Sequence, residues 1–592
     1  MTNSEIAKIM REIAFYLDME AVPFKPRAYE KAAYAIESTD RPLDELYRQE
    51  GLKGIEAIPG VGKSIAEKIA TLVETGDLPY YEALRRKMPV DIEQLSAVEG
   101  LGPKMIQTLY RELGIRTVDD LEAAAKGGKI REIPHFGEKS EEKILKGIAF
   151  LRKSRGRYSL GAVLPWVSEI ESRLRNIPGV KRVEMAGSIR RRKETIGDGD
   201  LLVVADVPDR VMNFFVTMPE VVSVDAKGPT KSSVKLKSGI DIDLRVVPEE
   251  NFGAALCYFT GSKAHNIALR KLAIGKDLKL SEYGLFRGEE MIAGRTEEAV
   301  YAALGLPFIP PELREDTGEI EAALARMLPD LIGYDDLRGD LQTQTDWTDG
   351  AHSIEEMALE AKRLGREYIA ITDHTRSLAM AKGSDEKKLR RQMAEINALN
   401  KKLRGARDGH PGITLLKGAE VNINKDGTLD IDDETLAELD VVGVAVHSHF
   451  NMPREEMTRR IIRAMENRHA DILFHPTGRV LQKRAPYEVD IDEIIRAAKR
   501  TGTILEIDAF PERLDLKDEH VRKVVEAGVK LVIDSDAHHL HHLSYLHFGI
   551  AVARRGWAKK SDVINTLPLG KFLGSLKGGR TDLPLRGEEG IP

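Results

Sequence analysis

The stretch MAGSIRRRKETIGDGDLLVVAD, residues 185–206, holds the residues whose types and spacing say most about chemistry. Asp198 and Asp200 stand two positions apart at the start of an apolar run, so on a β-strand both carboxylates project from the same face. Two like charges held so close require a divalent cation between them, and carboxylate oxygens suit Mg2+, which also keeps substrate phosphates as ligands. The pair therefore predicts a metal site for chemistry at phosphorus.

A third acid lies in the segment IDIDLRVVP, residues 240–248, where Asp241 and Asp243 share one face of a neighbouring strand. Three carboxylates can hold two metal ions for an in-line displacement at phosphorus. Two aspartates spaced by one residue are, by themselves, more often solvated acids at the edge of a strand. The interpretation depends on finding a Gly-Ser turn, the Asp-Gly-Asp pair and the later acid in one order.

Three N-terminal segments share a pattern in which a hydrophobic residue and one or two glycines lead into a helix. They are AIPGVGKSIAEKI (57–69), AVEGLGPKMIQTL (97–109) and EIPHFGEKSEEKI (132–144). A Gly-x-Gly hinge lets a partner approach the backbone closely, and the first amides of the next helix favour an anion such as a DNA phosphate. One copy alone could be an ordinary helix connection, but two full copies predict DNA binding through Gly60, Gly62, Gly100 and Gly102.

The C-terminal region is rich in histidine, with thirteen of the chain's fifteen histidines beyond residue 350. From residue 339 to about 576 strands alternate with helices, which predicts a parallel sheet or barrel with its active site at the carboxyl ends of the strands. Any one histidine would more often be a surface or core residue. Acidic and imidazole groups nevertheless recur at successive strand ends, and such mixed ligation suits Mn2+, Zn2+ or Fe. These residues are Asp373, His374, Glu420, His447, His449, His475, Asp536 and His538.

The remaining segments set the rest of the architecture. Residues 1–155 are expected to be wholly helical, and β-branched segments between residues 158 and 250 predict an antiparallel sheet with helices on it. The Pro-rich stretch FIPPELRED, residues 308–316, indicates a linker. The tail GGRTDLPLRGEEGIP has no periodicity and is expected to be disordered.

Bulk composition excludes some classes of protein. A chain of 592 residues should divide into several domains, and no apolar run approaches the ~20 residues that span a bilayer. The amphipathic N-terminus is no signal peptide, and a single cysteine, Cys257, favours a reducing, cytoplasmic location. The net charge is −6 and no third of the chain has a basic excess. Any DNA contacts would therefore come from backbone amides and local clusters such as residues 190–193.

The ordered set GS (187–188), GDGD (197–200), DIDLR (241–245) and YFTGSKAHN (258–266) resembles DNA polymerase family X. The resemblance covers residues 1 to about 307. It implies a nucleotidyltransferase that adds dNTPs to a primer on gapped or nicked DNA in repair, as a monomer. It also implies Asp198, Asp200 and Asp243 as ligands of Mg2+ or Mn2+.

The same resemblance implies the residues that bind the nucleotide. Ser188 and Arg191 match the positions that hold the triphosphate, a role their donors suit. Tyr258 and Phe259 match residues that close on the sugar, and Asn266 and Arg270 match positions near the nascent base pair and template. Gly187, Gly261 and Ser262 complete the set.

The N-terminal segment FKPRAYEKAA, residues 24–33, matches the lyase domain of the family. Lys68 falls where that domain carries its Schiff-base lysine, and Lys25 and Tyr29 match its DNA-binding positions. A lysine that attacks a sugar aldehyde must be partly neutral, which neighbouring cations favour. Ser64 stands where a second lysine often assists, so 5′-deoxyribose-phosphate lyase activity stays open.

Residues beyond 339 are similar to the PHP (polymerase and histidinol phosphatase) domain, a distorted seven-stranded barrel that holds up to three metals. That domain implies 3′-5′ exonuclease and abasic-site endonuclease activity with Mn2+ or Zn2+. Its ligand positions are matched by Asp349, His374, Glu420, His447, His475, Asp536 and His538.

One departure concerns the first strand of this barrel. The family has His-x-His where this chain has Gln342 and Gln344. Amide oxygens cannot match imidazole as ligands of these metals, so we expect at least one metal to be lost or weakened. The run HHLHHLSYLH, residues 538–547, supplies further imidazoles, and we expect it to be a surface cluster.

The expected domains follow the resemblance. They are a helical lyase-like domain with a helix-hairpin-helix motif (1–85), a fingers-like helical domain with a second helix-hairpin-helix motif (86–155), a nucleotidyltransferase palm (156–250), a thumb-like domain (251–307), a linker (308–338), the PHP barrel (339–577) and a disordered tail (578–592). The leading hypothesis is a gap-filling repair polymerase with an impaired nuclease. The alternative is mainly a metal-dependent 3′-end or abasic-site nuclease of base excision repair. A non-catalytic DNA-binding scaffold would require the carboxylates to be idle.

Overall fold

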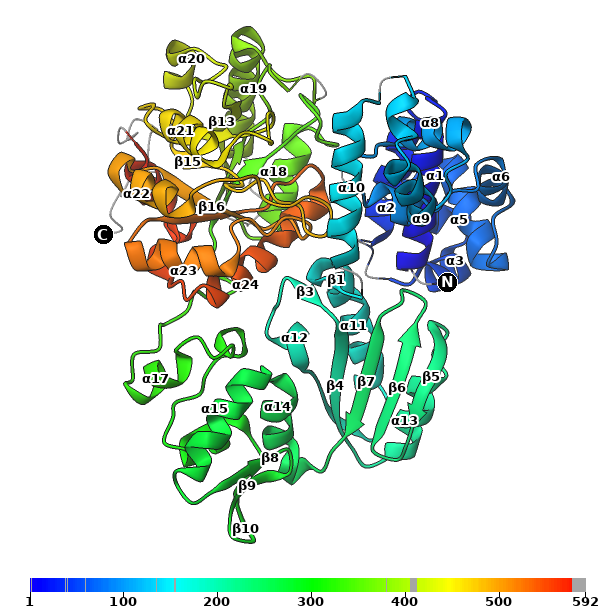
Figure 1. Ribbon diagram of the computed structural model, residues 1–592, viewed down its shortest axis with the longest axis vertical. Coiled ribbons are helices and arrows are strands. Elements are labelled where there is room, and N and C mark those ends of the chain that lie inside the picture. The colour runs from blue at the N-terminus through cyan, green and yellow to red at the C-terminus, as the bar shows by residue number, and fades with distance from the viewer. Residues whose placement is uncertain are drawn as a thin grey trace.

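The structure is a computed structural model that describes residues 1–577, apart from residues 2, 38, 40, 59, 99, 135, 154–155, 379–380 and 405–411. The tail expected to be disordered, residues 578–592, lies outside the described residues. Figure 1 shows a helical N-terminal part, a part built on an open sheet, and a C-terminal barrel beside the helices. In the described part of the chain, no helix combines the length and apolar character needed to cross a membrane.

The N-terminal part is helical throughout, as predicted, because its apolar residues recur at helical spacing and pack into one core. Ile6 and Ile13 of α1 are fully buried in this core with Ile36 of α2. Caps fix the helix starts: Thr117 forms a reciprocal capping box with Asp120 at the start of α9. The elements are α1 (Asn3–Met19), α2 (Lys25–Glu37), α3 (Leu43–Glu50), α4 (Leu52–Glu56), α5 (Lys63–Thr75), α6 (Pro79–Lys87), α7 (Ile92–Ser96), α8 (Pro103–Leu113), α9 (Val118–Lys126), η1 (Ile130–Glu132) and α10 (Glu138–Lys153).

A five-stranded sheet with the order β2-β4-β7-β6-β5 forms the next part. Its strands are β2 (Val180–Met185), β4 (Asp198–Ala205), β5 (Val221–Lys227), β6 (Lys231–Leu236) and β7 (Asp241–Val246). Helices α11 (Leu160–Arg175) and α13 (Pro208–Val216) pack their apolar faces into the core of this sheet. The short elements β1 (Tyr158–Ser159), α12 (Gly187–Arg190) and β3 (Thr195–Ile196) lie at its edge.

The prediction of an antiparallel sheet was wrong at one place, because β4 and β7 pair in parallel. The other neighbours in this sheet pair antiparallel. Between β4 and β7 the chain passes through α13 and the β5–β6 hairpin, so it re-enters beside β4 in the same direction. Period-two patterning identifies strands but does not distinguish these two pairings.

A smaller unit follows and extends past the boundary expected from the sequence. It contains α14 (Phe252–Thr260), α15 (Lys263–Ile274), β8 (Lys279–Ser281), β9 (Gly284–Arg287), β10 (Glu290–Ala293) and α16 (Glu297–Ala303). Residues 308–338, expected to be a linker, instead hold η3 (Pro311–Leu313) and α17 (Glu319–Leu324) and pack onto this unit. Arg314 is fully buried there, with Nη1 2.6 Å from Glu297 Oε1. This burial depends on a partner 17 residues earlier in the chain, so the Pro-rich composition alone could not indicate it.

The C-terminal region is the predicted barrel, with seven parallel strands in sequence order. Asp534 on the last strand accepts a hydrogen bond from the Leu341 amide of the first at 2.8 Å, which brings the two edges together. The strands are β11 (Gly339–Thr343), β12 (Tyr368–Ile371), β13 (Thr414–Asn422), β14 (Val441–Ala445), β15 (Ile472–Leu473), β16 (Ile504–Asp508) and β17 (Leu531–Asp534).

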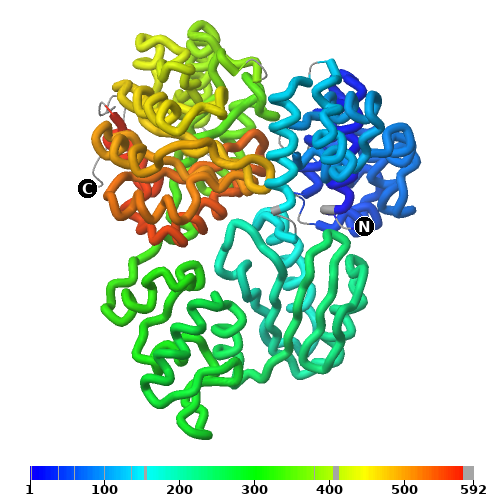
Figure 2. Tube along the Cα trace, in the orientation of Figure 1, coloured from blue at the N-terminus to red at the C-terminus, as the bar shows by residue number. Residues whose placement is uncertain are grey.

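Helices cover the outside of this barrel. They are α18 (Ile354–Arg363), α19 (Glu386–Arg404), α20 (Asp433–Ala437), α21 (Arg454–Met465), α22 (Ile491–Thr501), α23 (Asp518–Ala527), α24 (Leu546–Arg555) and α25 (Leu569–Ser575), with the short turns η5 (Leu540–Tyr545), η6 (Lys560–Asp562) and η7 (Ile564–Thr566). The tube in Figure 2 shows the barrel, green to red, lying against the blue helical N-terminal part.

Candidate active sites

The parallel pairing of β4 and β7 brings the predicted carboxylates side by side. Asp198 lies beside Asp241, and Asp200 lies beside Asp243. Burial raises the pKa of Asp200 to about 7, with smaller contributions from the charges of Asp198 and Asp243. An acid that resists ionisation beside two others is a place where a cation would relieve the repulsion.

Two side chains of β6 contact Asp243 of β7. Lys231 Nζ lies 2.7 Å from Asp243 Oδ2, and Ser233 donates to Asp243 Oδ1 at 2.6 Å. Among residues that the structure describes, the groups of possible ligands within 4.8 Å of one another do not include Asp198, Asp200 and Asp243. In this structure Asp243 is paired with Lys231 and is not gathered with Asp198 and Asp200 as a group of ligands.

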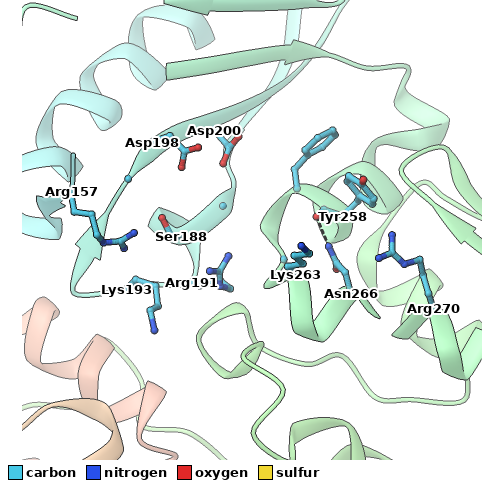
Figure 3. Close-up of a pocket in the computed structure, with 14 residues that line it drawn as sticks. Arg157, Ser188, Arg191, Lys193, Asp198, Asp200, Tyr258, Lys263, Asn266 and Arg270 are labelled. Carbon is cyan, nitrogen blue, oxygen red and sulfur yellow. Dashed lines mark hydrogen bonds between the residues drawn. The ribbon is translucent and has the colours of Figure 1, made fainter. Parts of the chain in front are cut away.

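A cavity of about 760 Å³ opens beside Asp198 and Asp200 (Figure 3). This volume is in the range of cavities that enclose small ligands. The predicted residues that line it are Gly187, Ser188, Arg191, Asp198, Asp200, Tyr258, Phe259, Gly261, Asn266 and Arg270. Asp243 and Ser262 are not in its lining. The Ser262 hydroxyl instead caps α15 by accepting from the His265 amide at 3.2 Å.

The backbone at the start of α12 explains why glycine precedes Ser188. Gly187 has φ +60, and a Cβ there would lie 2.2 Å from Asp200 Oδ2, so a side chain would collide with a carboxylate of the site. The Ser188 hydroxyl is buried and has no hydrogen-bond partner within the described residues. A buried donor without a partner beside a cavity suits an anionic oxygen of a ligand.

Three further basic residues, which the sequence had not assigned to nucleotide binding, line the cavity. Arg157, Lys193 and Lys263 line it together with Arg191 and Arg270. Lys193 ends the basic run that the sequence singles out, and Lys263 lies in the YFTGSKAHN motif, so both had a signal. Arg157 has none, because it reaches the cavity from just before β1. The charge of the cavity suits a polyanionic ligand such as a triphosphate.

The two full hinges have the backbone expected of an anion-binding loop. Gly60 and Gly100 have φ of +89 and +86, which favour glycine, and Gly62 and Gly102 cap α5 and α8 without a side-chain cap. A Cβ at Gly62 or Gly102 would meet nothing within 4 Å. Internal packing therefore does not demand glycine at these two positions, whereas the close approach of a partner backbone would.

Lys68 lies on α5, beyond the first hinge. Its Nζ is 3.0 Å from both the carbonyl and the hydroxyl oxygen of Ser64. Burial lowers the pKa of Lys68, and Lys25 lowers it further, while Glu67 opposes them. Tyr29 is buried on α2. A lysine with a lowered pKa is closer to the neutral form that a nucleophile needs.

In the barrel, Glu420 is the centre of the predicted ligands. His447 Nε2 and His475 Nε2 lie 2.9 and 2.8 Å from its Oε1, and His374 Nδ1 lies 3.4 Å from its Oε2. Burial favours the neutral acid, but these imidazoles outweigh it and hold the pKa of Glu420 well below its usual value. Among the residues that the structure describes, two groups bring their ligand atoms within 4.8 Å of one another: Asp349, His374 and His538, and His374, Glu420 and His447.

Gln342 and Gln344 project into the same barrel and are fully buried. Gln344 donates to Glu420 Oε2 at 2.8 Å. Its carbonyl oxygen and both polar atoms of the Gln342 amide have no partner in the described structure. The acid and histidine sets fit a metal, since they offer oxygen and nitrogen ligands at short range. The amide nitrogen of Gln344 does not fit, because it places a proton donor against a ligand oxygen.

Asp536 forms an ion pair with Arg513, a residue that the sequence did not indicate. Arg513 Nε lies 3.3 Å from Asp536 Oδ2 and 3.3 Å from Asp508 Oδ2, at the mouth of the barrel. His538 Nδ1 is 3.7 Å from Asp536 Oδ1. Asp536 therefore neutralises a guanidinium in addition to lying near the ligands. Of the residues at strand ends, His449 is exposed, and Asp373 binds Thr345, Thr348 and Gln392.

The expectation of a surface histidine cluster was wrong. His539 and His542 are buried, and both rings contact Tyr34 of α2, at centroid distances of 5.1 and 5.0 Å. Arg27 of the same helix donates to the carbonyl of Asp349 at 3.1 Å. The N-terminal helical part therefore covers part of the run 538–547. Local sequence patterns cannot predict a contact between residues more than 300 positions apart.

Four families match consecutive parts of the chain. Residues 1–78 match a helix-hairpin-helix domain, residues 92–149 a SAM-like helix-hairpin-helix tandem, residues 255–315 the DNA polymerase beta thumb, and residues 340–510 the PHP domain. The predicted kinds of domain, helix-hairpin-helix, polymerase thumb and PHP, are thus confirmed.

Complete proteins are similar as well. DNA polymerase/3'-5' exonuclease PolX of Bacillus subtilis is 38% identical over 574 residues, which cover 96% of this chain and 98% of that protein. DNA polymerase lambda of Rattus norvegicus is 27% identical over 343 residues, 53% of this chain and 56% of that protein. A probable phosphatase of Thermoanaerobacter sp. is 29% identical over 250 residues, 40% of this chain and 94% of that protein.

Proposed function

The chain belongs to DNA polymerase family X, among the members that carry a C-terminal PHP domain, and we propose that it fills gaps in DNA during repair by adding dNTPs to a primer end. The observation that carries the proposal is the pairing of Asp198 and Asp200 with Asp241 and Asp243 beside a basic cavity. The experiment that tests it is primer extension on a one-nucleotide gap.

Each side chain of the polymerase site has a role that its position supports. Asp198, Asp200 and Asp243 would hold divalent cations, Mg2+ or Mn2+, which when bound would supply charge neutralisation and activation of the primer hydroxyl. Ser188 and Arg191 bind the triphosphate, with their donors at the cavity. Tyr258 and Phe259 flank the sugar, and their rings meet edge to face at 5.1 Å.

Asn266 and Arg270, which line the cavity, would contact the nascent base pair and the template. Asn266 donates to the Tyr258 carbonyl at 2.7 Å, so α15 and the end of α14 are fixed to each other. The helix-hairpin-helix hinges bind the DNA backbone on either side of the gap through Gly60, Gly62, Gly100 and Gly102. Their open approach supports backbone contact without sequence readout.

The second candidate function is the alternative weighed from the sequence, a metal-dependent DNA nuclease in the barrel. It is favoured by the two ligand groups within 4.8 Å, which suit Mn2+ or Zn2+. Gln342 and Gln344 remove two imidazoles from this site. We expect 3′-5′ exonuclease or abasic-site activity to be weak, abolished by His475→Ala and unaffected by Asp200→Ala.

A lyase activity is a third candidate, on the evidence of Lys68. The burial of its amine and the proximity of Lys25 both lower its pKa. Lys68 would attack the ring-opened sugar at a 5′ abasic end, and Lys25 and Tyr29 would bind the adjoining DNA. Trapping of the Schiff base by borohydride tests this role.

A further inference from the structure

Arg191, at the start of the loop that follows α12, lines the cavity beside Asp198 and Asp200, which we call the nucleotide cavity. The barrel contacts the backbone of this loop. Arg555, the last residue of α24, donates from Nη1 to the carbonyl oxygen of Arg191 at 2.9 Å. The same Nη1 lies 3.1 Å from Glu315 Oε1. The other edge of the guanidinium binds Asp518, whose Oδ2 is 2.8 Å from Nε.

Glu315 completes a path from the barrel to the cavity. Its Oε1 accepts from Arg191 Nε at 3.0 Å, so one carboxylate oxygen joins the guanidinium of Arg191 to that of Arg555. Arg191 Nη1 also donates to the Thr260 carbonyl. These contacts fix two of the three guanidinium nitrogens of Arg191. Figure 3 shows its side chain between those of Lys193 and Lys263 at the cavity.

The burial of this network makes it rigid. The side chain of Arg555 is 5% exposed and that of Arg191 is 13% exposed. Burial opposes ionisation of Glu315, but Arg191 and Arg555 outweigh it and lower its pKa. Charged groups that are both buried and paired are costly to separate, so they hold a defined geometry.

The barrel also contacts the far end of the same loop, through residues other than Arg555. Arg479 Nη2 lies 2.8 Å from Glu194 Oε2, and Gln482 donates to the carbonyl of Arg157. Arg157 and Lys193 line the nucleotide cavity. The barrel therefore contacts the loop near both Arg191 and Glu194.

We propose that Arg555 is a positioning residue for polymerisation: through Glu315 and the Arg191 carbonyl, the barrel aims the Arg191 guanidinium at the triphosphate. This rests on the proposed polymerase function. It gives the barrel a role in nucleotide binding that does not depend on metals at its own site. Loss of imidazoles at Gln342 and Gln344 would leave this role intact.

The test is steady-state gap filling by the full-length protein with saturating gapped DNA and Mg2+, with KM and kcat measured for the dNTP. Arg555→Ala is expected to raise KM about tenfold while kcat changes less than about twofold, because a triphosphate contact loses its alignment. Arg555→Lys keeps the charge but cannot span three partners, so an intermediate KM is expected.

Arg554→Ala is the matched control. Arg554 is the neighbouring residue of α24 and binds the same interface, with Nε 2.7 Å from Glu312 Oε1 and Nη1 2.8 Å from the Ile332 carbonyl. It makes none of the contacts to Arg191 or Glu315, so its removal is expected to leave KM within about twofold of wild type. An equal rise in KM for both variants would show general loosening of the interface and overturn the proposal.

Glu315→Gln tests the same path without removing a side chain from the barrel. It is expected to raise KM severalfold. In the double variant with Arg555→Ala, the fold-increase in KM should be smaller than the product of the two single fold-increases, because both changes act through one contact. If Arg555→Ala does not fold, as judged by its melting temperature, Glu315→Gln alone decides. An unchanged KM in the folded variants overturns the positioning role, whereas a wild-type protein that extends no primer overturns the polymerase function itself.

Discussion

The side-chain amide of Gln344 donates a hydrogen bond to Glu420 Oε2 at 2.8 Å, inside the barrel and with both side chains fully buried. Glu420 is also the acid against which His374, His447 and His475 gather. The oxygen that would bind a cation on this side is therefore occupied by a proton donor. This contact predicts that the barrel, although it has most of the expected ligands, binds metal less tightly at this position.

Replacing both glutamines, Gln342→His with Gln344→His, is expected to raise the metal content of the purified protein by about one ion per chain, because imidazole nitrogen replaces amide groups that are poor ligands. Elemental analysis after dialysis against Mn2+ or Zn2+ measures it. Gln94→His with Gln107→His, in the N-terminal helices, controls for added histidine. An unchanged content in the barrel variant would show that these glutamines do not limit the site.

The pKa of Asp200 predicts how stability depends on pH in protein without divalent cations. The folded-state pKa of about 7 exceeds the ordinary value near 4, so the folded protein binds a proton that the unfolded chain has released. Stability should therefore fall as pH rises from about 4 to 7. Asp200→Asn removes this loss, and its melting temperature at pH 8 should exceed that of wild type by several degrees.

Divalent cations provide a check on this effect of Asp200. Mg2+ or Mn2+ should raise the melting temperature of wild type at pH 8, because the cation stabilises the ionised acids. It should raise that of Asp200→Asn much less. Equal melting temperatures for the two proteins at pH 8 without cations would contradict the assignment of a strained carboxylate cluster.

Lys68 should form a Schiff base with DNA that carries a 5′ abasic sugar. Borohydride should trap a covalent complex in wild type and none in Lys68→Ala. Lys25→Ala removes a cation that lowers the pKa of Lys68, so trapping at pH 7 with saturating DNA should slow by a few fold. Lys53→Ala serves as a control on a different helix. Trapping that survives Lys68→Ala would assign the chemistry to another amine.

The hinge glycines should matter for DNA and little for folding. Gly62→Ala with Gly102→Ala adds methyl groups that meet nothing within 4 Å, at φ values of −79 and −87 that any residue adopts. We expect the Kd for gapped DNA to rise about tenfold by fluorescence anisotropy, with the melting temperature unchanged. Gly574→Ala, also in open space, is the control. Unaltered affinity would mean that the DNA backbone does not approach these hinges.

Local spacing predicted which strands carry the three aspartates, but not how the surrounding elements are arranged. The period-two placement of Asp198 and Asp200 on one face held, and so did the neighbouring strand with Asp243. The parallel direction of that strand, and the ion pair of Lys231 with Asp243, depend on chain connections that periodicity does not record. The contact of Arg555 with Arg191 joins residues far apart in the sequence, and no sequence pattern at either position predicts it.

The most direct test of the polymerase function is extension of a primer across a one-nucleotide gap by wild type, Asp200→Ala and Asp225→Ala. Asp225 is an exposed acid on β5 of the same sheet, so its removal should leave the rate unchanged. Wild type should incorporate the templated dNTP only when Mg2+ or Mn2+ is present, and Asp200→Ala should be slower by about a thousandfold or more. Extension by Asp200→Ala at the wild-type rate would contradict the account.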